Sequence, residues 1–415
     1  MERAALENQL SGHVGATLAA MSLFLSGQAG SIKTEQPFKL NSGPVQIESQ
    51  PVQIESKSVQ FESKPASQFK PSSQDSDFEA LVAAIIGQES NGRYNLTNPD
   101  SDALGACQIM PSNLPSWSKK HVGREVGRDE FLRSPSLQLK ICKGQLRVYW
   151  QREAGKLEEL RVRRVASTWY SGRPNLWNNT KPQYYNGRRY PSIADYTKSV
   201  WEKYQKEKRL NDLAKKIVTY SKNKGYKLYT SPGEKNIIYI EGMNLDGSLN
   251  DNALNSWNDL RIVLEFFEGS PKITGIWEAT TAPGKYYTDN PMNPQGAAII
   301  KPGQYWAWKV GTHGTKELHS GLIQTAGKVK VYRDKDKNGK RTGDKTNSGF
   351  FGINHHWGYD YPQRDIKKGA AGCLVGRTRA GHREFMKLIK QDPRYQDNQD
   401  FIFGATIIPG SELQN

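Results

Sequence analysis

A glutamate stands where the buried face of a helix is expected to continue. The apolar residues from Phe78 to Ile86 are spaced three and four positions apart, which indicates a helix with one buried stripe, and the same spacing brings Glu89 onto that stripe. Burial raises the pKa of a carboxyl group. A carboxylic acid that stays protonated near neutral pH can protonate a leaving oxygen, as a glycosidase requires. From position alone, a Glu89 that turns back to water at the helix end is an equally good interpretation.

A second group of chemically capable residues lies in the C-terminal half. His355 and His356 end a segment with a strand pattern, and Cys373 follows Gly372 after a polar loop. A thiol near an imidazole can act as a nucleophile, and the backbone N–H of the cysteine can bind an oxyanion. A small buried cysteine and a zinc site are the alternatives. Because neighbouring strand residues point to opposite faces, both histidines cannot easily serve one metal, and the thiol enzyme is favoured.

Three segments around Glu89 together resemble a known enzyme family. They are Gln88-Glu89-Ser90, Gly105-Ala106-Cys107-Gln108-Ile109-Met110-Pro111 and Ala166-Ser167-Thr168-Trp169-Tyr170-Ser171-Gly172. In this order they resemble the soluble, lysozyme-like lytic transglycosylases over residues 76–205. The resemblance implies that Glu89 is the general acid and base. The residues that it places along the substrate cleft are Ser90, Gln108, Met110, Trp169 and Tyr170.

The chain departs from the pattern of that family at positions that bear on the chemistry. Ala106 and Cys107 stand where Leu and Met are usual, and Tyr170 replaces an asparagine. The motif fixes no second carboxylate, although Asp100 and Asp102 lie in the adjacent loop. A hydrolase normally needs a second carboxylate, whereas a transglycosylase can reuse its single acid as a base and release an anhydro product. One glutamate therefore favours transglycosylation, with hydrolysis as the alternative.

The region around Cys373 resembles another family, the L,D-transpeptidase catalytic domains, over residues 237–410. The matching stretches are Tyr332-Arg333-Asp334, Gly352-Ile353-Asn354-His355-His356 and Gly369-Ala370-Ala371-Gly372-Cys373. The resemblance implies that Cys373 is the nucleophile and His356 its imidazole, with His355 in the place of an apolar residue. It also implies substrate contacts at Gly372, His355 and Arg377, the last through a carboxylate. Ala370 stands where Ser or Thr is usual, which removes a hydrogen bond to the histidine.

Charge and cysteine content narrow the partners. The chain has 415 residues, too many for one ordinary domain, a formal net charge of +16 and a pI near 9.5. A positive surface favours anionic partners, and the lysozyme-like motif favours the cell-wall polymer over nucleic acid and lipid. No apolar stretch predicts a membrane span. Among three cysteines, Cys107 and Cys142 could pair, but two buried free thiols are the preferred interpretation.

The first 76 residues predict a low-complexity arm. Short internal repeats at 44–64 indicate an extended linker, with docking to a partner protein as the alternative. An apolar segment at 14–25 resembles a signal peptide, but the residues before it lack the expected positive charge, so we do not expect cleavage.

The remainder predicts a multidomain α+β protein. Residues 77–205 are expected to form a mainly helical, lysozyme-like domain, and residues 206–236 a basic, solvent-exposed linker helix. Residues 237–415 are expected to form a mostly β, L,D-transpeptidase-like domain, either a sandwich or a barrel. Its predicted strands are 237–241, 262–267, 273–279, 305–310, 321–325, 329–332 and 350–356, and its predicted helix is 381–390. The sequence from Asp334 to Gly339 matches half of a calcium loop, but Lys345 replaces the last ligand, so a hairpin turn is favoured.

Both resemblances concern peptidoglycan. We therefore expect a bifunctional enzyme that cleaves glycan strands at Glu89 and acts on stem peptides through Cys373, without a metal or another cofactor. The alternatives are a glycan-cleaving enzyme whose β domain only binds the wall, and a structural phage-tail or secretion component with vestigial sites. The expected location is the cell envelope, the periplasm or the exterior, and the arm with its weak signal suits a phage-associated lysin.

Overall fold

The computed structural model describes residues 73–341 and 343–414. The repeats at 44–64 and the signal-like segment at 14–25 lie outside the described residues, and so do the predictions made for them. The described chain combines helices with a large β sheet, as the α+β prediction required. None of the described helices is long and apolar enough to cross a membrane.

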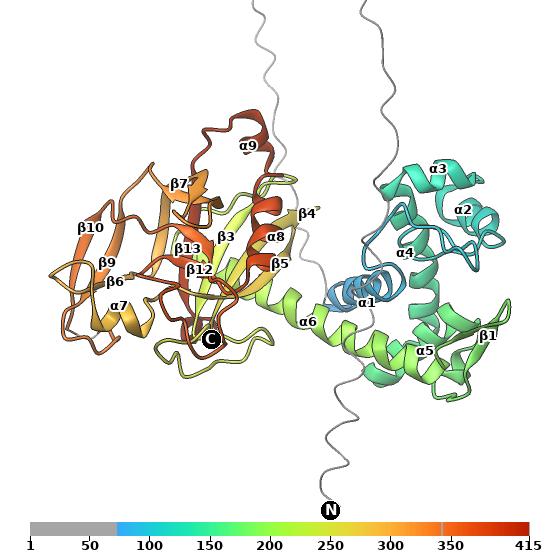
Figure 1. Ribbon diagram of the computed structural model, residues 1–415. Helices are drawn as coiled ribbons and strands as arrows, with labels where there is room; N and C mark the ends of the chain where they lie inside the picture. The colour runs from blue at the N-terminus through green and yellow to red at the C-terminus, as the bar shows by residue number, and fades with distance from the viewer. Residues whose placement is uncertain (1–72, 342, 415) are drawn as a thin grey trace, which may run out of the picture. The chain divides into compact units, whose positions relative to one another are not determined.

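Residues 73–223 fold mainly into helices around one apolar core (Figure 1). The elements are α1 (Ser73–Glu89), α2 (Leu114–Val122), α3 (Arg128–Arg133), α4 (Pro135–Arg152), α5 (Glu158–Ser171), the 3-10 helix η1 (Pro174–Leu176), the antiparallel strands β1 (Gln183–Tyr185) and β2 (Arg188–Tyr190), and α6 (Ile193–Asn223). A serine caps the N-terminus of each of two long helices. Ser134 caps α4 by accepting from the Leu137 N–H, and Ser192 caps α6 by accepting from the Asp195 N–H. The core includes Phe78, Leu81, Ile85, Phe131, Leu146, Val165 and Tyr204.

A disulfide joins Cys107 to Cys142, which are 35 residues apart in the sequence. It ties the loop between α1 and α2 to α4, and both side chains are buried in the helical core. The prediction of two free thiols is therefore wrong. Sequence spacing does not reveal that two Cα atoms lie within disulfide reach, here 6.4 Å. Cys373 is the free cysteine.

A closed barrel follows α6 (Figure 1). Its strands are β3 (Asn236–Glu241), β4 (Asp259–Phe267), β5 (Ser270–Thr280), β7 (Gly303–His313), β8 (His319–Gln324), β11 (His355–Trp357), β12 (Leu374–Gly376) and β13 (Phe403–Pro409). Around the barrel they pair in the order β11-β12-β5-β4-β3-β13-β7-β8, with β11–β12 and β13–β3 parallel and the other pairs antiparallel. Of the two folds left open for this region, the described strands form the barrel.

A smaller sheet and short helices complete the described chain. The strands β6 (Ala297–Ile300), β9 (Val329–Asp334) and β10 (Lys345–Gly349) pair in the order β10-β9-β6, and the helices are α7 (Lys285–Asp289), α8 (Arg379–Ile389), α9 (Pro393–Asp397) and the 3-10 helix η2 (Gly410–Leu413). Because β9 and β10 are antiparallel neighbours, the segment between them is a hairpin connection, as predicted. The helix predicted at 381–390 corresponds to α8, which packs on barrel strands.

Helix α6 contributes to two cores. Tyr196, Val200 and Tyr204 pack among the other helices. Farther along the same helix, Leu213 and Ile217 are buried against apolar residues of β3 and β4. The prediction of a solvent-exposed linker helix that begins at residue 206 is therefore wrong. Lysines are so frequent in this part of the sequence that the apolar positions between them were overlooked. These positions are spaced three and four residues apart and form a buried face.

The predicted strand at 350–356 is shorter than expected. Strand β11 begins at His355, and the N–H groups of Phe351 and Ile353 before it bond to the buried side chain of Gln324. The Gln324 side-chain oxygen accepts from the N–H groups of Phe351 and Ile353, each at 3.0 Å, and its Nε2 donates to the carbonyl of Gly349. One glutamine therefore fixes the irregular segment that leads into the second candidate site.

Two candidate active sites

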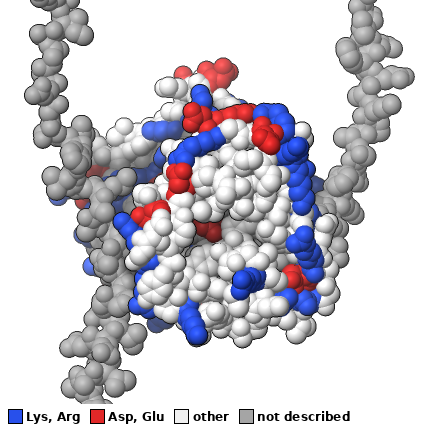
Figure 2. Space-filling view, turned by 90° about the vertical axis from the view of Figure 1, so that its right-hand side faces the viewer, with Lys and Arg blue, Asp and Glu red and all other residues white. Residues whose placement is uncertain are grey.

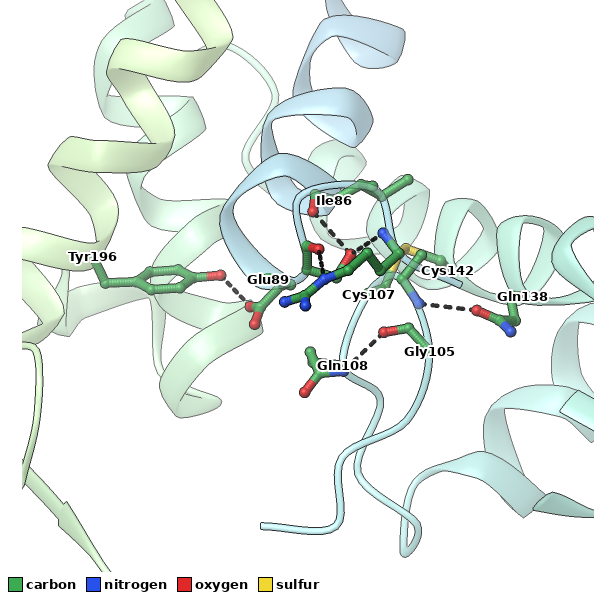
Figure 3. Close-up of a disulfide and its surroundings, with 11 residues drawn as sticks. Ile86, Glu89, Gly105, Cys107, Gln108, Gln138, Cys142 and Tyr196 are labelled. Carbon is green, nitrogen blue, oxygen red and sulfur yellow. Dashed lines mark hydrogen bonds between the residues drawn. A yellow bond between two sulfur atoms is a disulfide. The ribbon is translucent and has the colours of Figure 1, made fainter. Parts of the chain in front are cut away.

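Glu89 is the last residue of α1 and lies where the apolar stripe predicted. Its side chain is half-buried, and the Tyr196 hydroxyl on α6 donates a hydrogen bond of 2.5 Å to its Oε1, as Figure 3 shows. Burial raises the pKa of the Glu89 carboxyl from 4.5 to about 7, although hydrogen bonds from Tyr196 and Trp169 act in the opposite direction. Glu89 can therefore hold a proton near neutral pH, where an ordinary glutamate is ionised.

Aromatic rings surround this carboxyl group. Tyr170 stacks on Tyr196, with ring centroids 4.3 Å apart and an interplanar angle of 10°. Trp169 packs against Trp117 at 5.4 Å. Trp169 and Tyr170 are both half-buried beside Glu89, and their contact with a substrate stays a prediction. The sequence analysis missed Tyr196, although its place on the apolar stripe of α6 before Val200 was a usable signal.

The loop that carries Gln108 is fixed by hydrogen bonds to the buried side chain of Gln138. Gln138 on α4 accepts a hydrogen bond from the Ala106 N–H at 2.9 Å, and its Nε2 donates to the carbonyl of Tyr94. Gly105 has a φ of +69°, and a Cβ there would lie 2.2 Å from the Gln138 side-chain oxygen. The Gln108 side chain donates to the Gly105 carbonyl at 2.9 Å and stays half-buried, as does Met110.

Ser90 does not occupy the cleft position implied by the resemblance. Its side chain is 2% exposed, and its hydroxyl donates to the Ile86 carbonyl and accepts from the Arg93 N–H. These contacts close the C-terminal turn of α1. Ser90 is therefore a helix-end residue, whose hydroxyl is already bonded within the backbone turn.

Two carboxylates near Glu89 in the sequence are engaged by arginines. Asp100 accepts from Arg188 at 2.7 Å, and Asp102 forms an ion pair with Arg128 that holds the pKa of Asp102 below its usual value. Neither is an unpaired second carboxylate for Glu89.

The face of the molecule drawn in Figure 2 is hollowed near its middle, with acidic atoms inside the hollow and Lys and Arg side chains around its margins.

The pairing of β11 with β12 places Cys373 and His356 on one face of the sheet. His356 pairs with Val375 in parallel register, and paired residues point to the same face. Cys373 comes directly before β12, two positions before Val375, and packs against the apolar cluster that contains Val375, from which we infer that it lies on the same side of the sheet. Gly372 makes the turn before Cys373, with a φ of +118°. A Cβ at this position would lie 2.3 Å from the Ala298 carbonyl oxygen, so only glycine fits.

The Cys373 thiol is bonded to the backbone on either side of Ile353. Its sulfur accepts from the Asn354 N–H at 3.5 Å and donates to the Gly352 carbonyl at 3.3 Å. Burial raises the pKa of the thiol to about 11, while the Asn354 N–H lowers it. At neutral pH the thiol is protonated, so a base must take its proton before it can attack a carbonyl.

His356 is arranged as a neutral base. Its Nδ1 lies 2.8 Å from the Trp357 carbonyl, which can only accept, so Nδ1 carries the proton and Nε2 keeps its lone pair. The ring is 5% exposed, and burial lowers the pKa of His356 well below 6.5. His355 instead points into the barrel, where it is 0% exposed and lies 3.1 Å from the Tyr239 hydroxyl. The expected contact of His355 with a substrate is therefore wrong.

Arg377 and the candidate metal ligands are the remaining groups of the second site. Arg377 donates to Glu278 at 2.6 Å and to the Tyr361 carbonyl, so its guanidinium is already paired with one carboxylate. Within residues 73–341 and 343–414, the one group of metal-ligand type whose atoms lie within 4.8 Å of one another is Asp334, Asp336 and Asp344.

Comparisons of the chain with protein-family models, with curated proteins and with solved structures find no match. The functional argument therefore depends on the residues of the two sites.

Proposed function

We propose that this protein is a bifunctional peptidoglycan-modifying enzyme, with a lysozyme-like lytic transglycosylase region around Glu89 and an L,D-transpeptidase-like region around Cys373. The observation that carries the proposal is the half-buried carboxyl of Glu89, whose pKa of about 7 lets it act as acid and as base at the same pH. The pairing of Asp100 and Asp102 with arginines supports a mechanism with one carboxylate.

In the proposed glycan step, Glu89 donates its proton to the glycosidic oxygen between N-acetylmuramic acid and N-acetylglucosamine. The bond to the leaving sugar breaks as the anomeric carbon becomes electron-poor. The Glu89 carboxylate then removes a proton from a hydroxyl of the same muramyl residue, whose oxygen closes an anhydro ring. Tyr196 orients the carboxylate during both transfers through its hydrogen bond to Oε1.

In the proposed peptide step, Nε2 of His356 accepts the proton of the Cys373 thiol, and the sulfur attacks a stem-peptide carbonyl. The C–N bond breaks, the leaving amine takes the proton, and a thioester remains. An incoming amine or water then releases the acyl group from sulfur. The backbone N–H of Cys373 is the candidate donor to the oxyanion.

Charge and redox state support an envelope or extracellular location. A net charge of +16 favours the anionic wall, and this attraction should weaken as salt is added. The Cys107–Cys142 disulfide fits an oxidising compartment. A virion-associated lysin meets both conditions.

The test is digestion of purified peptidoglycan by the wild type, Glu89→Gln and Cys373→Ala, with products identified by mass spectrometry. Glu79→Gln is the matched control, because Glu79 lies exposed on the same helix and pairs with Lys143. Anhydro-muramyl ends should vanish only in Glu89→Gln, and stem-peptide changes only in Cys373→Ala.

Other product patterns would revise the proposal. Reducing ends in place of anhydro ends would make the first site a hydrolase. No peptide change in any sample would reduce the barrel to a wall-binding module. Full digestion by the Glu89→Gln, Cys373→Ala double variant would refute both assignments and favour a structural component with vestigial sites.

A further inference from the structure

A third imidazole lies against the proposed thiol site. His313 is the last residue of β7, and its ring stacks on His356 with centroids 4.1 Å apart and an interplanar angle of 9°. The two residues come from strands that are not neighbours in the barrel, because β8 lies between β7 and β11. The close parallel contact is therefore made by the side chains and is not a consequence of direct strand pairing.

His313 is also connected to the residue that holds the thiol. Nδ1 of His313 lies 3.2 Å from Nδ2 of Asn354, and the backbone N–H of Asn354 donates to the Cys373 sulfur. The other end of the Asn354 amide is fixed, since its oxygen accepts from the Gln324 N–H at 2.9 Å. Nδ2 of Asn354 must then donate, so Nδ1 of His313 accepts and a neutral His313 carries its proton on Nε2.

We propose that His313 is a positioning residue of the thiol site, which holds the His356 ring by stacking and the Cys373 loop through Asn354. The inference builds on the proposed acyl transfer at Cys373. His356 has a single fixed hydrogen bond, from Nδ1 to the Trp357 carbonyl, and that bond alone permits the ring to tilt. The flat face of His313 restricts the tilt and keeps Nε2 in the direction of the sulfur face of the sheet.

Other titratable groups face the same cluster. His319 on β8 lies 5.4 Å from His313 and 6.3 Å from His356, measured between ring centroids. Arg261 on β4 donates to the His356 carbonyl, and it also donates to Nδ1 of His382 on α8. A cationic His313 would therefore add charge to a cluster that already contains a buried arginine, which favours its neutral form.

The test is the rate at which iodoacetamide alkylates Cys373 in the full chain. The sequence has three cysteines and two are paired in the disulfide, so Cys373 is the one thiol that can react. His313→Ala should slow alkylation at pH 8 by about tenfold, a part of what a general base contributes. His313→Phe, which keeps a flat ring but has no acceptor for Asn354, should lose less.

A second background separates positioning from general loss of structure. Because the stacking on His356 is lost in a His356→Ala protein, His313→Ala should cause a clearly smaller loss there than in the wild type, with only the contribution through Asn354 remaining. Equal losses in both backgrounds, or wild-type alkylation by His313→Ala, would overturn the proposal. Thermal unfolding shows whether His313→Ala is misfolded. If it is, His313→Phe is compared in the wild-type and His356→Ala proteins instead.

The acyl-transfer assignment is judged by different data, the stem-peptide products. Coupling between His313 and His356 without any peptide products would keep the positioning role and reject the transpeptidase function.

Discussion

Burial raises the pKa of the central group at both candidate sites, but this helps the proposed chemistry at one site and hinders it at the other. At Glu89 it raises the pKa of a carboxyl to about 7, and at Cys373 it raises the pKa of a thiol to about 11. A general acid benefits from a retained proton, whereas a nucleophile must lose its proton before it reacts. The first site is therefore prepared by burial alone, and the second needs a base.

The difference explains the surroundings of each group. Glu89 is accompanied by hydrogen-bond donors, Tyr196 and Trp169, which moderate its pKa and orient it. Cys373 lies on the same sheet face as His356, which burial keeps neutral and able to accept a proton. The lowered imidazole pKa and the raised thiol pKa both favour an uncharged pair over a thiolate–imidazolium pair. The two sites should respond to pH in opposite directions.

The largest expected effect is this opposite response. Because the first step needs protonated Glu89, kcat/KM for glycan cleavage should fall about tenfold per pH unit above about 7. Alkylation of Cys373 should instead keep rising with pH toward about 11, since its thiolate fraction grows over that range. N-acetylcysteine, alkylated in parallel, should level off near the ordinary thiol pKa of about 8.5. A Cys373 rate that levels off below pH 7 would indicate an ion pair and contradict the neutral arrangement.

The second prediction concerns the disulfide, which one site has and the other lacks. Closing a loop across 35 residues contributes about 3–4 kcal/mol to the free energy of unfolding. Reductant should therefore lower the melting temperature of the helical region and reduce glycan cleavage, because Cys107 lies in the loop of Gln108. The Cys107→Ser, Cys142→Ser double variant is the control and should not respond to reductant. Calorimetry with equal wild-type melting curves in both conditions would show that the disulfide is not a stabilising link.

A third prediction follows from the stability cost of burying a carboxylate. The folded pKa of Glu89 is about 7 against 4.5 for an ordinary glutamate, so the charged form destabilises the fold progressively as pH rises between these values. Glu89→Gln should be more stable than the wild type by about 1–3 kcal/mol at pH 8 and nearly equal to it at pH 4.

The control for this prediction is in the other site. Cys373→Ala should show no such pH dependence between pH 4 and 8, because the thiol stays neutral in the folded and unfolded states over that range. Chemical denaturation at both pH values measures the difference. A gain for Glu89→Gln that is the same at pH 4 and pH 8 would arise from packing and not from charge.

The sequence was informative where a rule is local. The three-and-four spacing from Phe78 brought Glu89 onto the buried stripe of its helix, because helix geometry alone decides which residues share a face. Strand alternation predicted that His355 and His356 would separate to opposite faces. It did not show which face is the barrel interior, because that depends on closure by distant strands, and His355 was wrongly given a substrate contact.

Contacts between distant residues could not be predicted in this way. Tyr196 lies 107 residues after Glu89, and Cys142 lies 35 after its disulfide partner. Nothing in the intervening sequence states that these side chains meet. The same holds for His313, which reaches His356 from a strand on the far side of β8. The residue types in each site were visible, but the partners that orient them required the fold.

The smallest expected effect isolates one hydrogen bond. The Tyr196 hydroxyl stabilises the charged form of Glu89, so Tyr196→Phe should raise the Glu89 pKa further and move the alkaline limb of glycan cleavage upward by less than about one pH unit. Burial is the larger cause and stays in place. Tyr170→Phe is the matched control, because Tyr170 stacks on the same ring but its hydroxyl donates to the Pro191 carbonyl. An alkaline limb that moves equally in both variants, or downward in Tyr196→Phe, would contradict this role. Cys373 offers no equivalent variant, since the donor that lowers its pKa is the backbone N–H of Asn354. The acid in the first site can therefore be adjusted through one side chain, while the thiol in the second can be adjusted only through its proposed base, His356.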